Sequence, residues 1–145
     1  MLRGITADQG ILLCSLSGAS TEKAGRLMME LYRQDVRPDL CTQQAEGQLQ
    51  FSVSAHQRQT VQDVLADLAL GAEWEESWSK ISMVGCGMHS IPNIKQELFS
   101  ALSGHDIPYE NSWLGERRCS VLVPRERTDE AVRAFHEVLL RYHSL

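Results

Sequence analysis

A glycine-bearing turn at residues 85–90 collects most of the side-chain types in this sequence that could take part in chemistry. It reads Gly-Cys-Gly-Met-His-Ser, follows a short apolar run and leads into a helix-like segment. Such a turn can hold a phosphate on backbone N–H groups, bind a metal or act through a thiol, or hold the carboxylate of a small ligand. The rest of the chain must decide between these alternatives.

The phosphate interpretation rests on a near-match to the glycine-rich fingerprint of dinucleotide-binding folds. Glu110 lies at about the right distance for a ribose contact, but Ser90 stands where the third glycine is expected. The residues after Glu110 have the pattern of a hairpin and a helix, not of further strand–helix crossovers. A single near-match of this kind is weak evidence, so nucleotide binding is not favoured.

The metal and thiol interpretations rest on Cys86 and His89, which are three residues apart. A zinc site takes three or four ligands, and the remaining histidines show no matching spacing. Catalysis by a cysteine–histidine pair also needs a third group to orient the histidine. The other cysteines lie in apolar, strand-like runs: Cys14, Cys41 and Cys119. We therefore expect no metal and no cofactor, and we interpret all four cysteines as free thiols in a reducing cytoplasm.

The third interpretation is capture of a carboxylate by the backbone. The first N–H groups of a helix have no partner within the helix, and they attract anions. Gly85 and Gly87 allow a tight turn close to a ligand, and Asn93 suits a left-handed backbone position. The simpler alternative is that these residues only form the turn. The loop by itself does not choose between the two.

Composition excludes several classes of function. The chain has 145 residues, 43% of them apolar and 23% charged, with a net charge of -5 and a pI near 5.5. Its basic residues are scattered, so no field attracts nucleic acid. It contains no apolar run of about 18 residues that could span a membrane, and its first residues lack the apolar core of a signal peptide.

The elements that must position the loop occur in two matched copies. In the first copy, an apolar strand at 11–17 precedes a helix from Thr21 whose apolar residues recur at helical spacing. Strands follow at 36–42, where Pro38 indicates an edge or bulge, and at 49–53. A helix over 61–68, capped near Gly71, and a strand at 74–78 complete the copy.

The second copy repeats this order. It has a strand at 81–85, a helix over 94–102 ending near Gly104, strands at 107–112 and 119–123, and a last helix for which Thr128 is the expected N-cap. Equivalent positions are offset by 67 to 71 residues: Gly18 and Gly85, Val36 and Ile107, Asp39 and Glu110. A strand–helix–strand–strand–helix repeat is a stronger signal than any single motif here.

The repeat predicts an α+β fold of two ferredoxin-like βαββαβ units, each an antiparallel sheet with both helices on one face. The second copy lacks its last strand. The segment 2–7 can supply it by crossing to the second sheet, which interlocks the two copies. The predicted domains are residues 11–78, and residues 79–145 together with the N-terminal strand 2–7.

Three stretches of the second copy resemble the second ACT domain of aspartokinase regulatory regions. They are KISMVGCGMHSIPNIKQELFSAL, IPYENSWLGERRCSVLV and DEAVRAFHEVLL. The first is similar to the family pattern K-[IV]-S-x-[IV]-G-x-G-M-x-S-x-P-G, and the last to A-V-x-A-L-H-E-x-F. The first copy resembles the preceding ACT domain less closely, through LRGITAD and VRPDLCTQQ. The resemblance covers roughly residues 2–140.

The resemblance implies tandem ACT domains that bind a free amino acid, typically lysine or threonine, at an ACT–ACT interface, and that form a dimer. It implies a non-catalytic module, since the kinase activity of the family lies in a separate upstream domain that could be a partner of this chain. A module that regulates a partner enzyme without a ligand is the alternative. The implied effector-binding residues are Gly18, Ser20, Thr21, Glu22, Gly25, Gln43 and Gln44, with a secondary loop at Gly87, Met88, His89 and Ser90.

Three departures from the family pattern bear on the effector. The family loop P-D-x-P-G is replaced by residues 20–25, which are one residue longer and contain no proline. Gln44 stands where asparagine is usual, and residues 113–116 replace a hydroxyl-rich S-T-S-E run. We therefore expect the effector to differ from that of typical members, if the site is retained.

Overall fold

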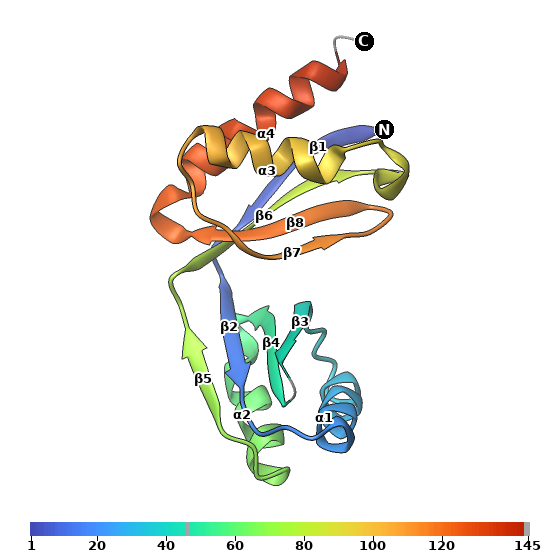
Figure 1. The fold of residues 1–145 in the computed structure, drawn as a ribbon. Coiled ribbons are helices and arrows are strands. Elements are labelled where there is room, and N and C mark those ends of the chain that lie inside the picture. Colours follow the sequence, from blue (N-terminus) through green and yellow to red (C-terminus); the bar gives the residue numbers. More distant parts are fainter. Residues whose placement is uncertain (46, 144–145) are drawn as a thin grey trace. The chain divides into compact units, whose positions relative to one another are not determined.

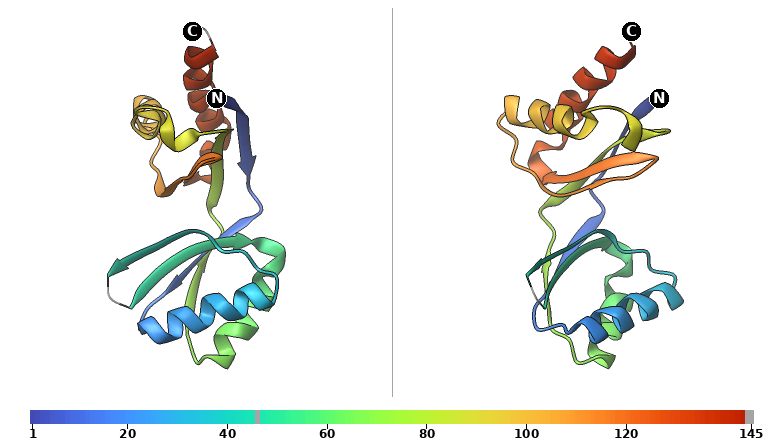
Figure 2. Two further views of the ribbon diagram at one scale, coloured as in Figure 1. Left: turned by 90° about the vertical axis from the view of Figure 1, so that its right-hand side faces the viewer. Right: turned by 45° about the vertical axis from the view of Figure 1, so that its right-hand side comes forward.

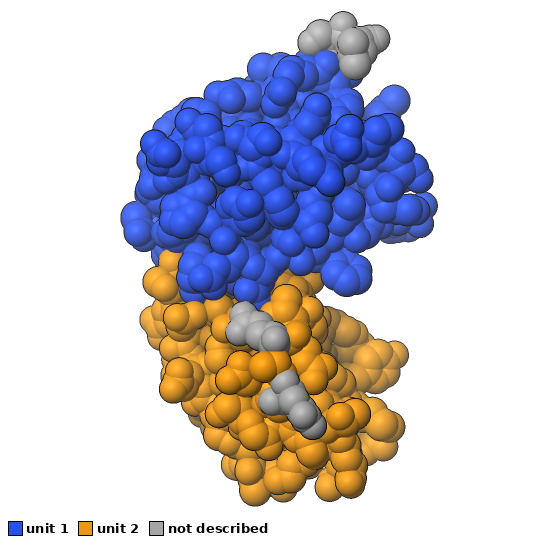
Figure 3. Space-filling view, in the orientation of Figure 1, with its two compact units in different colours: residues 1–9, 78–145 blue, residues 10–77 orange. Residues whose placement is uncertain are grey.

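The computed structural model describes residues 1–45 and 47–143, and the side chain of Gln44 is not part of that description. Its contacts divide the chain into two compact units (Figure 3). Unit 1 comprises Met1–Gln9 and Trp78–Leu145, and unit 2 comprises Gly10–Ser77. Unit 2 thus holds the first copy of the repeat, and unit 1 holds the second.

Unit 2 is a four-stranded antiparallel sheet, here called sheet B, with the strand order β3-β4-β2-β5. Helices α1 and α2 cover one of its faces, as Figures 1 and 2 show. The elements in chain order are β2 (Ile11–Leu16), α1 (Thr21–Arg33), β3 (Asp39–Ala45), β4 (Gln48–Ser54), the short 3-10 helix η1 (Ala55–Gln57), α2 (Arg58–Asp67) and β5 (Ala72–Glu75).

Unit 1 repeats this arrangement in sheet A, with the strand order β1-β6-β8-β7. Its elements are β1 (Leu2–Asp8), β6 (Trp78–Gly85), the 3-10 helix η2 (Met88–Ser90), α3 (Ile94–Gly104), β7 (Glu110–Leu114), β8 (Arg118–Pro124), the 3-10 helix η3 (Arg125–Arg127) and α4 (Thr128–His143). The N-terminal strand β1 pairs antiparallel with β6 (Figure 1), so the prediction that it completes the second sheet is confirmed.

Each unit has its own apolar core between sheet and helices. Alternate residues of the central strands face the helices, which is why Cys14 and Phe51 in unit 2 and Ile81 and Val121 in unit 1 are buried. Phe135 of α4 is the largest buried side chain of the core of unit 1. Two separate cores are what a tandem of small domains requires.

Several local predictions were wrong. α2 ends at Asp67, and the left-handed residue that follows it is Ala69 (φ 54°), not Gly71. Thr128 is the first helical residue of α4 and not its N-cap, and its hydroxyl donates to the carbonyl of Arg125 (2.6 Å). Cys41 is exposed, although it was placed in an apolar, strand-like run. By contrast, the left-handed backbone predicted for Asn93 is confirmed, since its φ is 60°.

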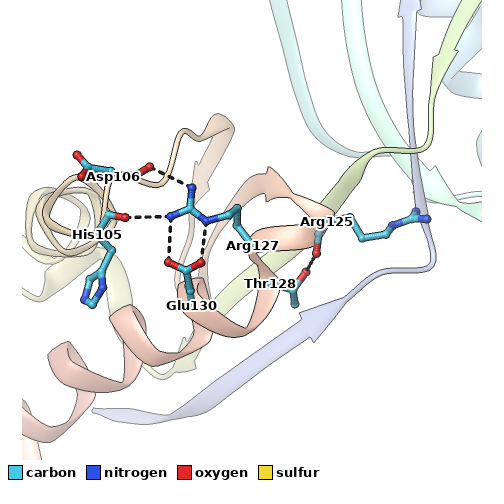
Figure 4. Close-up of polar contacts among 6 residues, drawn as sticks. All are labelled: His105, Asp106, Arg125, Arg127, Thr128 and Glu130. Atoms are coloured by element: carbon cyan, nitrogen blue, oxygen red, sulfur yellow. Dashed lines mark hydrogen bonds and ion pairs between the residues drawn. The ribbon is translucent and has the colours of Figure 1, made fainter.

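Arg127 ties the loop after α3 to the start of α4 (Figure 4). Its guanidinium donates to both carboxylate oxygens of Glu130, each at 2.9 Å, and to the carbonyls of His105 (3.0 Å) and Asp106 (3.3 Å). The hydrogen bond and charge of Arg127 hold the pKa of the Glu130 carboxyl below its ordinary value of 4.5.

We expect Glu130→Gln to lower the melting temperature at pH 7 and to have little effect in acid. A carboxyl whose pKa is lowered by folding stabilises the protein above its unfolded pKa, and this contribution is lost as the pH falls through the lowered value. Melting curves at pH 7 and pH 3 measure the difference, with exposed Glu73→Gln as the matched control. A gap between wild type and Glu130→Gln that stays constant with pH would contradict this explanation.

None of the helices in the described part of the chain is long and apolar enough to cross a membrane.

Candidate functional site

The loop between β2 and α1 in unit 2 is built on two glycines with positive φ. Gly18 has a φ of 75°, and Gly47, in the turn between β3 and β4, has a φ of 78°. Both values fall in the left-handed region that favours glycine. The N–H of Ala19 donates to the carbonyl of Gly47 (3.1 Å), so the loop and the turn hold each other in place.

Ser20 begins α1 as its N-cap. It has an extended backbone, and its Oγ accepts a hydrogen bond from the N–H of Lys23 (3.2 Å). Thr21 and Glu22 form the exposed first turn, where helix N–H groups point out of the helix end. The helix forms because Leu27 and Leu31 are buried against sheet B at helical spacing.

A hollow of about 390 Å³ lies at this loop, lined by Gly18, Ala19, Ser20, Thr21 and Gly47. Its lining offers backbone amides and two hydroxyl groups and no acidic side chain. A helix N-terminus of this kind favours a carboxylate over a cation, because the helix dipole and the N–H groups are both directed at the ligand. The arrangement suits the carboxylate end of a small molecule.

The structure brings together only part of the predicted effector site. Gly18, Ser20 and Thr21 line the hollow, and exposed Glu22 follows them on α1. Gly25, predicted in the loop, lies instead in the second turn of α1, because the helix already begins at Thr21. Gln43 is exposed on the edge strand β3, opposite Leu49, and is not part of the lining.

The remaining predicted residue, Gln44, has a side chain outside the described part of the structure, and only its place in β3 is known. Sequence reasoning missed Gly47 and Ala19. The Glu46-Gly47 turn was visible in the sequence, but its approach to Gly18 depends on the pairing of β3 with β4 and of β4 with β2. Only the three-dimensional sheet brings these two turns together.

The equivalent loop of unit 1, at residues 85–90, has a different character. Gly87 has a φ of 64° as predicted for a tight turn, while Met88 is fully buried in the core. The N–H of Met88 donates to the carbonyl of Glu116 (2.8 Å), and His89 and Ser90 are exposed. The N–H groups of Gly85, Cys86, Met88 and Ser90 thus all donate within unit 1.

Across the residues that the structure describes, neither metal binding nor chemistry at the buried thiols gains support. Among the described residues, no group of three or more histidine, cysteine, aspartate or glutamate side chains is placed to hold a metal ion. Burial raises the pKa of the Cys14 thiol to about 12, so this thiol is not a nucleophile near neutral pH. Burial also raises the pKa of Cys119.

A larger hollow of about 580 Å³ lies on sheet B, over parts of β4, β2 and β5. Ser15, Gln50 and the carboxylates of Glu73 and Glu75 are among its lining residues. Gln50 donates to the Ser15 hydroxyl at 3.0 Å. Two carboxylates and no basic residue make this hollow unsuitable for an anion. The smaller hollow at the start of α1 is thus the better candidate for a carboxylate ligand.

Residues 81–139 match the family model of the ACT domain. The chain is also 24% identical over 150 aligned positions to the aspartokinase of Corynebacterium glutamicum, a match that covers 94% of this chain and 36% of that protein. The chain therefore spans about a third of the length of this relative, as it does for the aspartokinase of Thermus thermophilus.

Two solved structures show the same architecture. The ligand-free regulatory subunit of aspartate kinase from Thermus thermophilus superimposes with a TM-score of 0.82 at 25% identity, over 94% of this chain and 97% of that subunit. Aspartokinase III of E. coli, solved with lysine and aspartate, matches with a TM-score of 0.69 at 20% identity, over 95% of this chain and 33% of that one. The second likeness is one of fold alone. Together with the two sheets, these matches confirm the predicted fold class of paired ferredoxin-like units.

Proposed function

We propose that this chain is a regulatory module that binds a free amino acid. The premise is that residues 81–139 form an ACT domain and that the chain is a tandem of ACT units resembling the aspartokinase regulatory region. The binding site is the loop between β2 and α1 of unit 2. The described residues form the two regulatory-type units, and a kinase catalytic domain is not among them. The two domains of the proposal are these two units.

The observation that carries the proposal is the hollow at the start of α1. Its backbone donors and the Ser20 and Thr21 hydroxyls suit an α-carboxylate. A free amino acid also needs acceptors for its ammonium group, since a buried charge without a partner is costly. The exposed carboxylate of Glu22 and the side-chain amides of Gln43 and Gln44 are the candidate acceptors.

Gln43 lies outside the lining of the hollow, so in this proposal a second copy of the chain supplies it to the site. β3 is an edge strand of sheet B, so it can meet the same strand of a second chain. A homodimer of this kind would bring an ACT–ACT interface to the hollow. Its partner enzyme would be an aspartokinase catalytic domain or a related enzyme, and its compartment the cytoplasm.

A lysine-like or threonine-like effector, as the family resemblance implies, is the first choice, and aspartokinase III of E. coli was solved with lysine. The departures in the loop argue for testing a wider set. A module that docks on a partner enzyme without any ligand is the second candidate, favoured by the exposed Trp113 (49%) on edge strand β7.

Isothermal titration of the chain with each of the twenty amino acids tests the proposal. We expect one or a few of them to give saturable heat. Thr21→Phe, which fills the hollow, should abolish this heat, whereas Ser100→Phe on the exposed face of α3 should retain it. The absence of saturable heat with all twenty amino acids would refute the proposal and leave the docking module.

A further inference from the structure

The edge strand that pairs with the first strand of each repeat copy, β2 or β6, approaches the loop after that strand differently in the two units. In unit 2 this strand is β5, which pairs with β2 only as far as Leu16, opposite Ala72. The chain before β5 turns back into the end of α2, where the N–H of Leu70 donates to the carbonyl of Leu65 (2.9 Å). β5 therefore stops short of the loop at Gly18.

In unit 1 the same place in the sheet is filled by β1. It pairs with β6 up to Leu2, opposite Gly85, which is the position equivalent to Gly18. The N–H of Cys86 donates to the carbonyl of Met1 (2.9 Å). The main chain of residues 1–2 thus lies in the 85–90 loop.

The space around the two equivalent glycines, Gly85 and Gly18, shows how closely β1 or β5 approaches each loop. A Cβ atom added to Gly85 would lie 2.3 Å from the Met1 carbonyl oxygen and 3.1 Å from the Leu2 Cα. A Cβ atom added to Gly18 would meet nothing within 4 Å. Gly85 is thus required by the strand against it, while the space at Gly18 is open to a ligand.

The remaining contacts of the 85–90 loop strengthen the contrast. Gly85 donates to the carbonyl of Arg117 (2.9 Å) and Met88 to that of Glu116 (2.8 Å). Leu2 is itself anchored, since only 3% of its surface is exposed and it packs in the core of unit 1. The strand end is held by a buried side chain on one side and by the loop on the other.

We infer that residues 1–2 are a built-in occupant of the ligand loop of unit 1, a strap that holds this loop closed. Of these two described loops, the one in unit 2 is then open, and the chain takes one amino acid there. The stoichiometry rests on the proposed function, but the closure of the loop by β1 does not. The two copies of the repeat thus differ in role: the loop of unit 2 binds a ligand, and the loop of unit 1 binds a segment of its own chain.

Amide hydrogen exchange, measured by NMR on the whole chain, tests the strap. The Cys86 and Met88 amides should be protected in the wild type without any ligand. Gly85→Ala should push the strand away and speed exchange at Cys86 at least ~10-fold, whereas the matched Gly4→Ala, with open space around it, should leave it unchanged. If Gly85→Ala does not fold, Leu2→Ala, which weakens the anchor, takes its place.

Rapid exchange at Cys86 in the wild type, or unchanged exchange in both Gly85→Ala and Leu2→Ala, would overturn the strap. Calorimetric titration with the bound amino acid should end at one equivalent per chain, and two equivalents would also overturn it. Absence of binding by all twenty amino acids would refute the proposed function instead, and the exchange rates at Cys86 would then decide on the strap alone.

Discussion

Phe51→Ala should destabilise unit 2 by about 3–5 kcal/mol, and Phe135→Ala should destabilise unit 1 by a similar amount. Each ring is fully or almost fully buried, Phe51 with 0% and Phe135 with 1% of its surface exposed. Each removal leaves a cavity between the sheet and its helices, which the neighbouring backbone fills only in part. Because the two rings belong to separate cores, each loss should be largest in its own unit.

Urea denaturation followed by tryptophan fluorescence measures both effects. Trp74 lies in unit 2, and Trp78 and Trp113 lie in unit 1, so variants that retain one set report on one unit. Tyr32→Ala is the control, because this ring is 67% exposed and its removal should change stability by no more than about 0.5 kcal/mol. Equal losses in both units from Phe51→Ala alone would contradict the separation of the cores.

The second large effect is stabilisation by the effector. A ligand that binds only the folded protein adds about 2.7 kcal/mol at a free concentration of 100 times its Kd. The proposed site is formed by β2, α1 and the β3–β4 turn, all within unit 2. The gain should therefore appear first in the unfolding of unit 2. The Thr21→Phe variant, which fills the hollow, should show no gain at the same amino-acid concentration.

The repeat made most of the fold predictable. Strand and helix periodicities differ clearly in this sequence, and two copies of one order fix the architecture better than either alone. The assignment of residues 2–7 to the second sheet followed from a missing strand, and the pairing of β1 with β6 confirms it. Asn93 was predictable because few side chains other than glycine adopt its left-handed backbone.

The sequence did not reveal which of the two equivalent loops is open to a ligand and which is closed by the chain itself. The motif at 85–90 is the stronger family signature, yet its Met88 is a core residue and its amides bond within unit 1. The strap at Gly85 depends on a strand more than 80 residues away, which no local pattern reveals. The helix start at Thr21 was predicted correctly, yet Gly25 was still assigned to the loop, because family loops of another length guided that assignment.

The central claim, that a free amino acid binds at the loop of unit 2, is tested most directly by the unfolding of unit 2 seen through Trp74 alone. The variant Trp78→Phe/Trp113→Phe retains Trp74 as its single tryptophan. Its urea transition, recorded without ligand and with each amino acid in turn, should move by about 2.7 kcal/mol when the bound amino acid is present at 100 times its Kd. A transition that does not move with any of the twenty amino acids would contradict the claim.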